Sequence, residues 1–129
     1  MQILGIDYGQ KKVGIAFASA TLADPLMVIR YNSPNELLDR LKKIISDYKI
    51  EKIVLGISEH ASAQKSREFA KVLEEKFNLI VDFEDETLSS LDAQTISMQL
   101  GIKRKKRKTL EDAYAATLIL QSYLDKISK

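Results

Sequence analysis

The sequence predicts a single mixed α/β domain in which strands lead the chain and then alternate with helices. Its 129 residues match the usual size of one domain, and 45% of them are hydrophobic, enough for an ordinary core. Strands close together in sequence pair antiparallel, whereas strands separated by helices need crossovers and become parallel. We therefore expect one sheet with an antiparallel part and a parallel part, flanked by helices, in a single domain spanning residues 1–129.

The first three expected strands lie near the N-terminus. Residues 3–7 form a short apolar run that stops at a turn before Gly9, which is typical of a buried strand. Residues 12–18 follow after a tight connection, so the two strands should form a hairpin. A third strand is expected over 25–31, which completes an antiparallel meander.

A well-marked helix follows, because Ser33, Pro34 and Glu36 match a capping box with proline at the first helical position. A later helix is expected to bury Phe69, Val72, Leu73 and Phe77 on one face. The remaining elements alternate: a strand over 52–57, a helix over 63–77, a strand over 79–83, and helices over 90–100 and 109–127.

The formal net charge of +2 conceals a strong asymmetry along the chain. Outside one basic run, acidic side chains outnumber basic ones, which indicates a localised contact with a polyanion. A mobile solvated loop or a targeting patch is the alternative reading of this run. The run consists of Lys103, Arg104, Lys105, Lys106, Arg107 and Lys108.

Several protein classes are excluded by composition. The chain has no cysteine, which rules out a disulfide scaffold, a thiolate zinc site and a cysteine nucleophile. No stretch approaches the ~20 apolar residues that a membrane span needs, and the N-terminus lacks the features of a secretory signal. We expect a cytoplasmic protein with no membrane partner.

Two carboxylates follow strands that should run parallel. Asp7 ends the first strand, and Glu86 follows the fifth, so both should lie at the same edge of the sheet, where ligands of open α/β sheets bind. Asp7 could instead be a turn-forming residue before Gly9. Glu86 could instead be a loop acid that favours the N-terminus of the next helix.

Asp112 lies at the start of the last expected helix. The stripe of that helix that should face the sheet continues through Ala116, Ile119, Leu120, Tyr123 and Ile127. Asp112 extends this buried face by one turn, where an unpaired carboxylate would be costly. A capping pair with Thr109 is the alternative, and both readings are compatible.

Three converging carboxylates without a histidine cluster are hard oxygen ligands that suit Mg²⁺ or Mn²⁺. Paired divalent ions can activate a water and stabilise the leaving oxygen in phosphodiester cleavage. The neighbouring basic run would supply contacts for phosphates.

The chain resembles the YqgF/RuvX family of the ribonuclease H-like superfamily. The resemblance rests on four motifs in order: the opening segment 5–16, the strand 54–57 with the helical segment 67–70, the segment 85–90, and the closing segment 112–116. It implies a five-stranded mixed sheet in the order 3-2-1-4-5, and Asp7, Glu86 and Asp112 as the metal-binding acidic triad.

Two features depart from the family pattern. Thr87 stands where the family usually has arginine, which removes a bidentate partner for a phosphate or a carboxylate. The loop after the fourth strand lacks the usual proline and carries Glu59, a further candidate ligand, and His60. A lone loop histidine is usually just solvated, although His60 could touch the substrate or the attacking water.

Together these features predict a metal-dependent endonuclease of structured nucleic acid that uses Mg²⁺ or Mn²⁺. Lys12, Arg67 and the run 103–108 would hold phosphates. The resemblance implies maturation of the 5′ end of pre-16S rRNA as the leading function, with resolution of four-way DNA junctions as the alternative. A nucleic-acid-binding module without catalysis is a further alternative, whereas an actin-like ATPase would need a longer chain. The sequence leaves open whether the protein is a monomer or a homodimer, and whether one or two ions bind.

Overall fold

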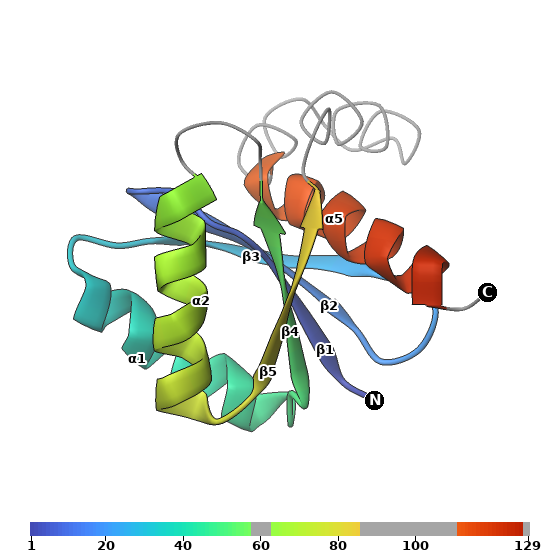
Figure 1. The fold of residues 1–129 in the computed structure, drawn as a ribbon, viewed down its shortest axis with the longest axis horizontal. Helices are drawn as coiled ribbons and strands as arrows, with labels where there is room; N and C mark the ends of the chain where they lie inside the picture. Colours follow the sequence, from blue (N-terminus) through green and yellow to red (C-terminus); the bar gives the residue numbers. More distant parts are fainter. Residues whose placement is uncertain (58–62, 86–110, 128–129) are drawn as a thin grey trace.

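The structure is a computed structural model, and it describes residues 1–57, 63–85 and 111–127. Within these ranges it contains one sheet of five strands with helices on both faces (Figure 1). The helix expected over 90–100 lies outside the described residues, as does the basic run 103–108. No helix in the described part of the chain is long and apolar enough to cross a lipid bilayer.

The sheet has the strand order β3-β2-β1-β4-β5, which confirms the predicted order. Its strands are β1 (Ile3–Asp7), β2 (Lys12–Ala18), β3 (Asp24–Arg30), β4 (Lys52–Ile57) and β5 (Ile80–Asp85). Strands β1, β2 and β3 pair antiparallel, whereas β1, β4 and β5 are parallel. The expected division into an antiparallel meander and a parallel part is therefore correct.

Two strands differ from their predicted bounds. Strand β3 ends at Arg30, one residue before the predicted end at Tyr31, although the Tyr31 backbone N–H still donates to the carbonyl of Lys11 at 3.1 Å, in register with the pairing of β2 and β3. Strand β5 begins at Ile80, two residues after Asn78, whose φ of 55° turns the chain out of α2. It then pairs with β4 as far as Asp85.

The described helices are α1 (Pro34–Asp47), α2 (Ala63–Phe77) and α5 (Glu111–Ile127). The predicted cap of α1 is present, since the Ser33 hydroxyl accepts the backbone N–H of Glu36 at 3.3 Å. The Glu36 carboxylate, however, accepts the backbone N–H of Asn32 at 3.1 Å. In a standard capping box it would accept the N–H of the N-cap residue itself, which here is Ser33.

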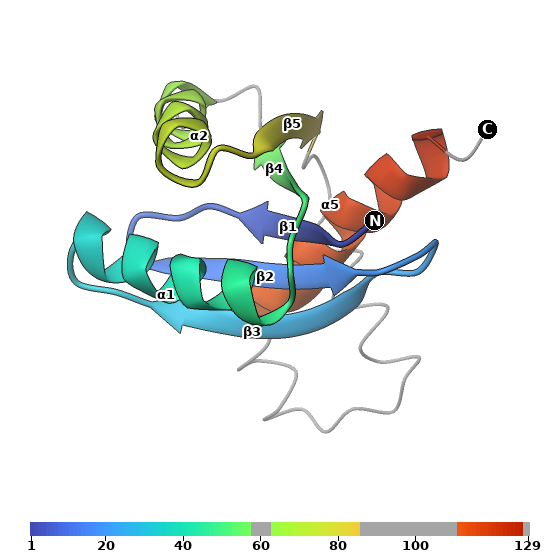
Figure 2. The ribbon, with the colours of Figure 1, turned by 90° about the horizontal axis from the view of Figure 1, so that it is seen from below.

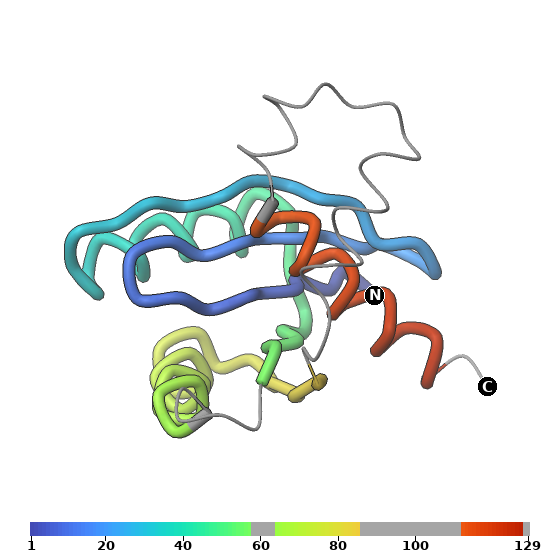
Figure 3. Tube along the Cα trace, turned by 90° about the horizontal axis from the view of Figure 1, so that it is seen from above, coloured from blue at the N-terminus to red at the C-terminus, as the bar shows by residue number. Residues whose placement is uncertain are grey.

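The helices form a layer on each side of the sheet. Helices α1 and α2 cover one face, and α5 crosses the opposite face (Figures 2 and 3). Side chains alternate between these faces along each strand. On β1, Leu4 and Ile6 enter the core under α1 and α2, whereas Ile3 lies in the core under α5.

Two predicted core positions are wrong. Val72 is 42% exposed, because α2 faces the sheet with Ser66, Phe69, Ala70 and Leu73. Ile127 is 56% exposed at the end of α5, one turn beyond Tyr123 and Leu124, the last buried residues of the helix. In both cases the helix is present, but its buried stripe is narrower or shorter than the apolar pattern.

Helix α5 approaches the sheet very closely over β1 and β2. A Cβ atom added to Gly5 would lie 2.8 Å from the Cβ of Leu120, and one added to Gly14 would overlap the carbonyl oxygen of Asp112. Only glycine leaves room for a helix backbone at such a distance. These two glycines therefore determine how low α5 sits on the sheet.

The second half of α5 is held to β4 and β5 by polar contacts. The Tyr123 hydroxyl donates to Asp82, and the ammonium of Lys52 lies 3.0 Å from Asp82 and 2.8 Å from the Tyr123 hydroxyl. The carboxylate of Glu84, which is only 5% exposed, accepts hydrogen bonds from Ser122 and Lys126. The carboxylates of Asp82 and Glu84 therefore link the sheet to α5.

We predict that Gly14→Ala lowers the free energy of unfolding by about 3 kcal/mol, because the added methyl group would have to push the α5 backbone off the sheet. Chemical denaturation measures this loss. Ser19→Thr is the matched control, since it adds one methyl group at an exposed position just after β2. Equal stabilities of the two variants would contradict the prediction.

Candidate active site

Asp7 is the last residue of β1, at the carboxyl edge of the sheet. Side chains alternate along the strand, so Asp7 faces the same side as Ile3 and Gly5, which contact α5 and its core. Its carboxylate is therefore directed to the layer that α5 occupies, on a half-buried residue. The predicted placement of Asp7 at a strand end is correct.

Asp112 is the second residue of α5 and lies beside Asp7. Gly14 pairs with Asp7 in the ladder between β1 and β2, and the Cα of Gly14 faces the carbonyl of Asp112. The two acids are thus neighbours across one glycine, although they are far apart in sequence. This adjacency is the central geometric fact of the site.

The Asp112 carboxylate is paired with a lysine rather than buried without a partner. The ammonium of Lys12 lies 3.0 Å from Oδ2 of Asp112, and the two side chains are 47% and 29% exposed. Asp112 is therefore more accessible than the stripe pattern of α5 indicates, and its charge is compensated at the surface. Thr109, the alternative capping partner, lies outside the described residues.

Arg30 is a further cation at this edge, and the sequence analysis missed it. It pairs with Lys12 in the ladder between β2 and β3, so the two side chains stand on the same face of the sheet. Arg30 is exposed and has no ion-pair partner among the described residues. Only the strand register could have revealed it, because nothing in the local sequence distinguishes it.

Of the remaining predicted site residues, Arg67 lies within the described part of the chain and outside this cluster. Arg67 is exposed on α2, in the helical layer opposite α5. The predicted acid Glu86 and the loop residues Glu59 and His60 lie outside the described residues. The basic run 103–108 does so as well. Strand β5 ends at Asp85, at the same edge of the sheet as the end of β1.

The carboxylates of Asp7 and Asp112 fit part of a coordination shell for a divalent cation. Magnesium commonly takes one or two protein carboxylates and completes its shell with waters and substrate phosphates. In the described ranges, no group of three or more His, Cys, Asp or Glu side chains could hold a metal ion. The candidate ligands among the described residues are therefore the two carboxylates of Asp7 and Asp112. Oxygen ligands of this kind suit Mg²⁺ or Mn²⁺ rather than zinc.

The connection between β1 and β2 joins Asp7 to Lys12, and contacts on the face of the sheet that α1 and α2 cover hold it in place. The Tyr31 hydroxyl donates to the carbonyl of Gly9, and the Tyr31 N–H donates to Lys11. The ring of Tyr8 stacks on Phe69 of α2, with 4.2 Å between the ring centroids. These contacts hold the chain on both sides of the turn between Asp7 and Lys12.

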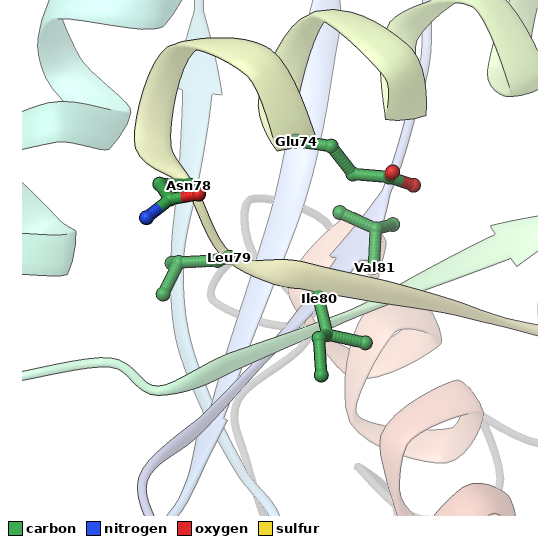
Figure 4. Close-up of a pocket in the computed structure, with 5 residues that line it drawn as sticks. All are labelled: Glu74, Asn78, Leu79, Ile80 and Val81. Atoms are coloured by element: carbon green, nitrogen blue, oxygen red, sulfur yellow. The ribbon is translucent and has the colours of Figure 1, made fainter.

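A separate pocket lies at the opposite edge of the sheet. It has a volume of about 380 Å³ and is lined by Glu74, Asn78, Leu79, Ile80 and Val81, where α2 ends and β5 begins (Figure 4). The start of β5 is at the amino edge, whereas Asp7 and Asp112 lie at the carboxyl edge. This pocket is therefore not part of the candidate site.

The chain is similar to one protein family and to named relatives over nearly its whole length. Residues 1–126 match the family RuvX, described as Holliday junction resolvase. A relative from Dictyoglomus thermophilum is 36% identical, with 99% of this chain and 98% of the relative covered. A relative from Desulfitobacterium hafniense is 40% identical, with 98% of this chain and 94% of the relative covered. Both carry the name "Putative pre-16S rRNA nuclease".

Solved structures show the same fold at low sequence identity. RuvC of T. thermophilus, in complex with a Holliday junction substrate, aligns with a TM-score of 0.62 and 18% identity over 98% of this chain and 96% of that one. The resolvase of Fowlpox virus, solved with Holliday junction DNA, aligns with a TM-score of 0.68 and 15% identity over 100% of both chains. The predicted ribonuclease H-like fold is thereby confirmed.

We predict that Tyr31→Phe costs about 1 kcal/mol of stability, because it removes the hydrogen bond to Gly9. Burial, and next the neighbouring Tyr8, raise the pKa of Tyr31 to about 12. A phenol with a raised pKa stabilises the fold below its ordinary pKa of 10, and this contribution is lost as the pH rises towards 12.

The measurement is denaturation of wild type and Tyr31→Phe at pH values between neutrality and about 12, set by the ordinary and raised pKa values. The wild type should lose more stability than Tyr31→Phe across the alkaline range. Tyr48→Phe serves as the control, since it removes a hydroxyl from another tyrosine, whose ring stacks on Phe17. Parallel curves for wild type and Tyr31→Phe would refute the assignment.

Proposed function

The chain belongs to the RuvX family, and on that basis we propose that it is a metal-dependent endonuclease that hydrolyses phosphodiester bonds in structured nucleic acid. The observation that carries this proposal is the adjacency of Asp7 and Asp112 across Gly14. Two acids at the carboxyl edge of a mixed sheet are placed where such folds bind ligands. The whole chain, residues 1–129, would form the nuclease domain.

Asp7, Glu86 and Asp112 are the proposed ligands of Mg²⁺ or Mn²⁺. Asp7 and Asp112 come from two elements that the close contact at Gly14 holds in register, so little reorganisation is needed to present both carboxylates to one ion. When bound, the ion would activate a water and stabilise the leaving oxygen of the phosphodiester. The acids themselves would hold that ion in place and compensate its charge.

Basic side chains would bind the nucleic-acid backbone around this site. Lys12 already lies next to Asp112, Arg67 is exposed on α2, and the run 103–108 ends three positions before the first residue of α5 in the sequence. Phosphate contacts of this kind supply most of the affinity and make it sensitive to salt. We therefore expect binding that weakens steeply as the ionic strength rises.

Maturation of the 5′ end of pre-16S rRNA is the proposed biological reaction, carried out in the cytoplasm. It is supported by relatives named "Putative pre-16S rRNA nuclease", which match at 36% to 40% identity over nearly their whole length. Cleavage of four-way DNA junctions is the second candidate, favoured by the family description. The first reaction is compatible with a monomer, whereas paired cuts in a junction would require a homodimer.

A binding module without catalysis is the alternative to both reactions. Its motivation is Thr87, which stands where the family usually has arginine, so that one partner for a phosphate or carboxylate is lost. Such a module would bind nucleic acid in a salt-dependent manner but would cut nothing with any divalent metal. The cleavage experiment below separates the two proposals.

We predict that Asp7→Asn lowers the cleavage rate at least about 100-fold while nucleic-acid binding is nearly retained, because loss of a metal ligand removes several kcal/mol of transition-state stabilisation. The control is Asp39→Asn, which removes a carboxylate from an exposed position of α1. If purified Asp7→Asn cuts as well as wild type, Asp7 is not part of the catalytic site.

The substrate is tested by the same proteins in a cleavage panel with Mg²⁺ and Mn²⁺. A precursor rRNA fragment that spans the 16S 5′ end is compared with a four-way DNA junction, and Asp7→Asn is the blank. We expect cleavage of the RNA in preference to the junction. Preferential, symmetric cleavage of the junction would favour the second candidate, and cleavage of neither would favour the binding module.

A further inference from the structure

We propose that Lys12 is a positioning residue with two alternative partners, the Asp112 carboxylate before a divalent cation binds and a backbone phosphate, shared with Arg30, afterwards. The inference rests on the proposed metal site and adds to it a coupling between binding of the cation and binding of nucleic acid. The observations behind it are one ion pair, one cross-strand pair and the exposure of the side chains involved.

The first observation is the ion pair itself. Lys12 Nζ lies 3.0 Å from Asp112 Oδ2, in direct contact with an oxygen that the proposed function assigns to a cation. An ammonium group and a divalent cation repel each other and cannot both hold that oxygen closely. Lys12 and the cation therefore compete for Asp112.

The second observation is that this pair can be exchanged. The side chain of Lys12 is 47% exposed and that of Asp112 is 29% exposed, so water screens their attraction. Ion pairs of this kind contribute little to stability. Lysine also has a long flexible stem, so its ammonium can move to a new partner without any change in the backbone.

The third observation is the position of Arg30. Lys12 and Arg30 are directly paired across β2 and β3, on the same face of the sheet. Like charges at such positions repel, and Asp112 compensates Lys12 while Arg30 has no ion-pair partner among the described residues. Once Asp112 turns to another cation, the two side chains form a pair of positive charges that a phosphate would satisfy.

The coupling follows from this geometry. A cation at Asp112 releases Lys12 for a phosphate, and a phosphate on Lys12 and Arg30 removes the competitor from Asp112. Thermodynamic linkage requires the two effects on affinity to be equal. Arg40, which donates to the Arg30 carbonyl at 3.3 Å, helps to hold the end of β3 in place.

The first experiment measures Mn²⁺ affinity of the full chain by calorimetric titration, without nucleic acid. Lys12→Met should bind Mn²⁺ about two- to fivefold more tightly than wild type, the range that an exposed ion pair is worth. Lys12→Arg, which keeps the charge, should stay near wild type. The matched control is Lys11→Met, which removes the same charge from an exposed neighbour that lacks an ion-pair partner in the described part of the chain.

The second experiment measures binding to a fluorescent four-way DNA junction and to an RNA hairpin in EDTA, by anisotropy. Asp112→Asn should tighten binding, because it frees Lys12 for a phosphate. The gain should be smaller in the background of Lys12→Met, and the difference between the two gains is the part that depends on Lys12. Circular dichroism of each variant checks that it is folded.

The outcomes separate this inference from the proposed function. If Lys12→Met changes Mn²⁺ affinity no more than Lys11→Met, or if the gain from Asp112→Asn is the same in both backgrounds, the inference is wrong. Loss of Mn²⁺ binding in Asp112→Asn would then still support the metal site. If Asp112→Asn binds Mn²⁺ as tightly as wild type, both the metal site and the inference fail.

Discussion

The close approach of α5 to the sheet at Gly14 is the contact on which the site depends. With a side chain at this position, the carbonyl of Asp112 could not lie over β2, and the start of α5 would be lifted away from the end of β1. Because Gly14 pairs with Asp7 in the ladder, the same contact places two acids from opposite ends of the chain beside each other. The absence of a side chain at Gly14 is thus the first requirement of the candidate site, because the placement of its charged groups depends on it.

The rest of the molecule supports this contact from two directions. On the face of the sheet that α1 and α2 cover, Tyr31 and the stacked pair Tyr8 and Phe69 hold the connection that leads from Asp7 into β2. Beyond the site, Asp82 and Glu84 anchor the second half of α5 through Tyr123, Ser122, Lys52 and Lys126. The helix is therefore held at its far end by polar contacts and at its near end by packing on glycine, so its angle across the sheet is well determined.

The acidic side chains of Asp82, Glu84 and Asp112 differ in how many partners hold them. The pKa of Asp82 is lowered, chiefly by the hydrogen bond from Tyr123 and also by Lys52, which shows that this carboxylate is already stabilised by its partners. Glu84 is buried with two donors. Among the described residues, the carboxylate of Asp112 has Lys12 as its one partner, whereas those of Asp82 and Glu84 have two each, and a single exposed ion pair is readily exchanged.

The sequence by itself determined the order of the described elements, the division of the sheet, and the place of Asp7 and Asp112 at the ends of β1 and α5, because apolar periodicity, caps and turns are local signals. Only the tertiary structure decided which faces of the helices are buried, so Val72 and Ile127 were assigned to the core incorrectly. It also decided that Lys12 pairs with Asp112 and that Arg30 stands beside Lys12. The physical reason is that side-chain partners depend on strand register and on the distance between layers, and a glycine such as Gly14 has the same local signal whether or not a helix crosses it.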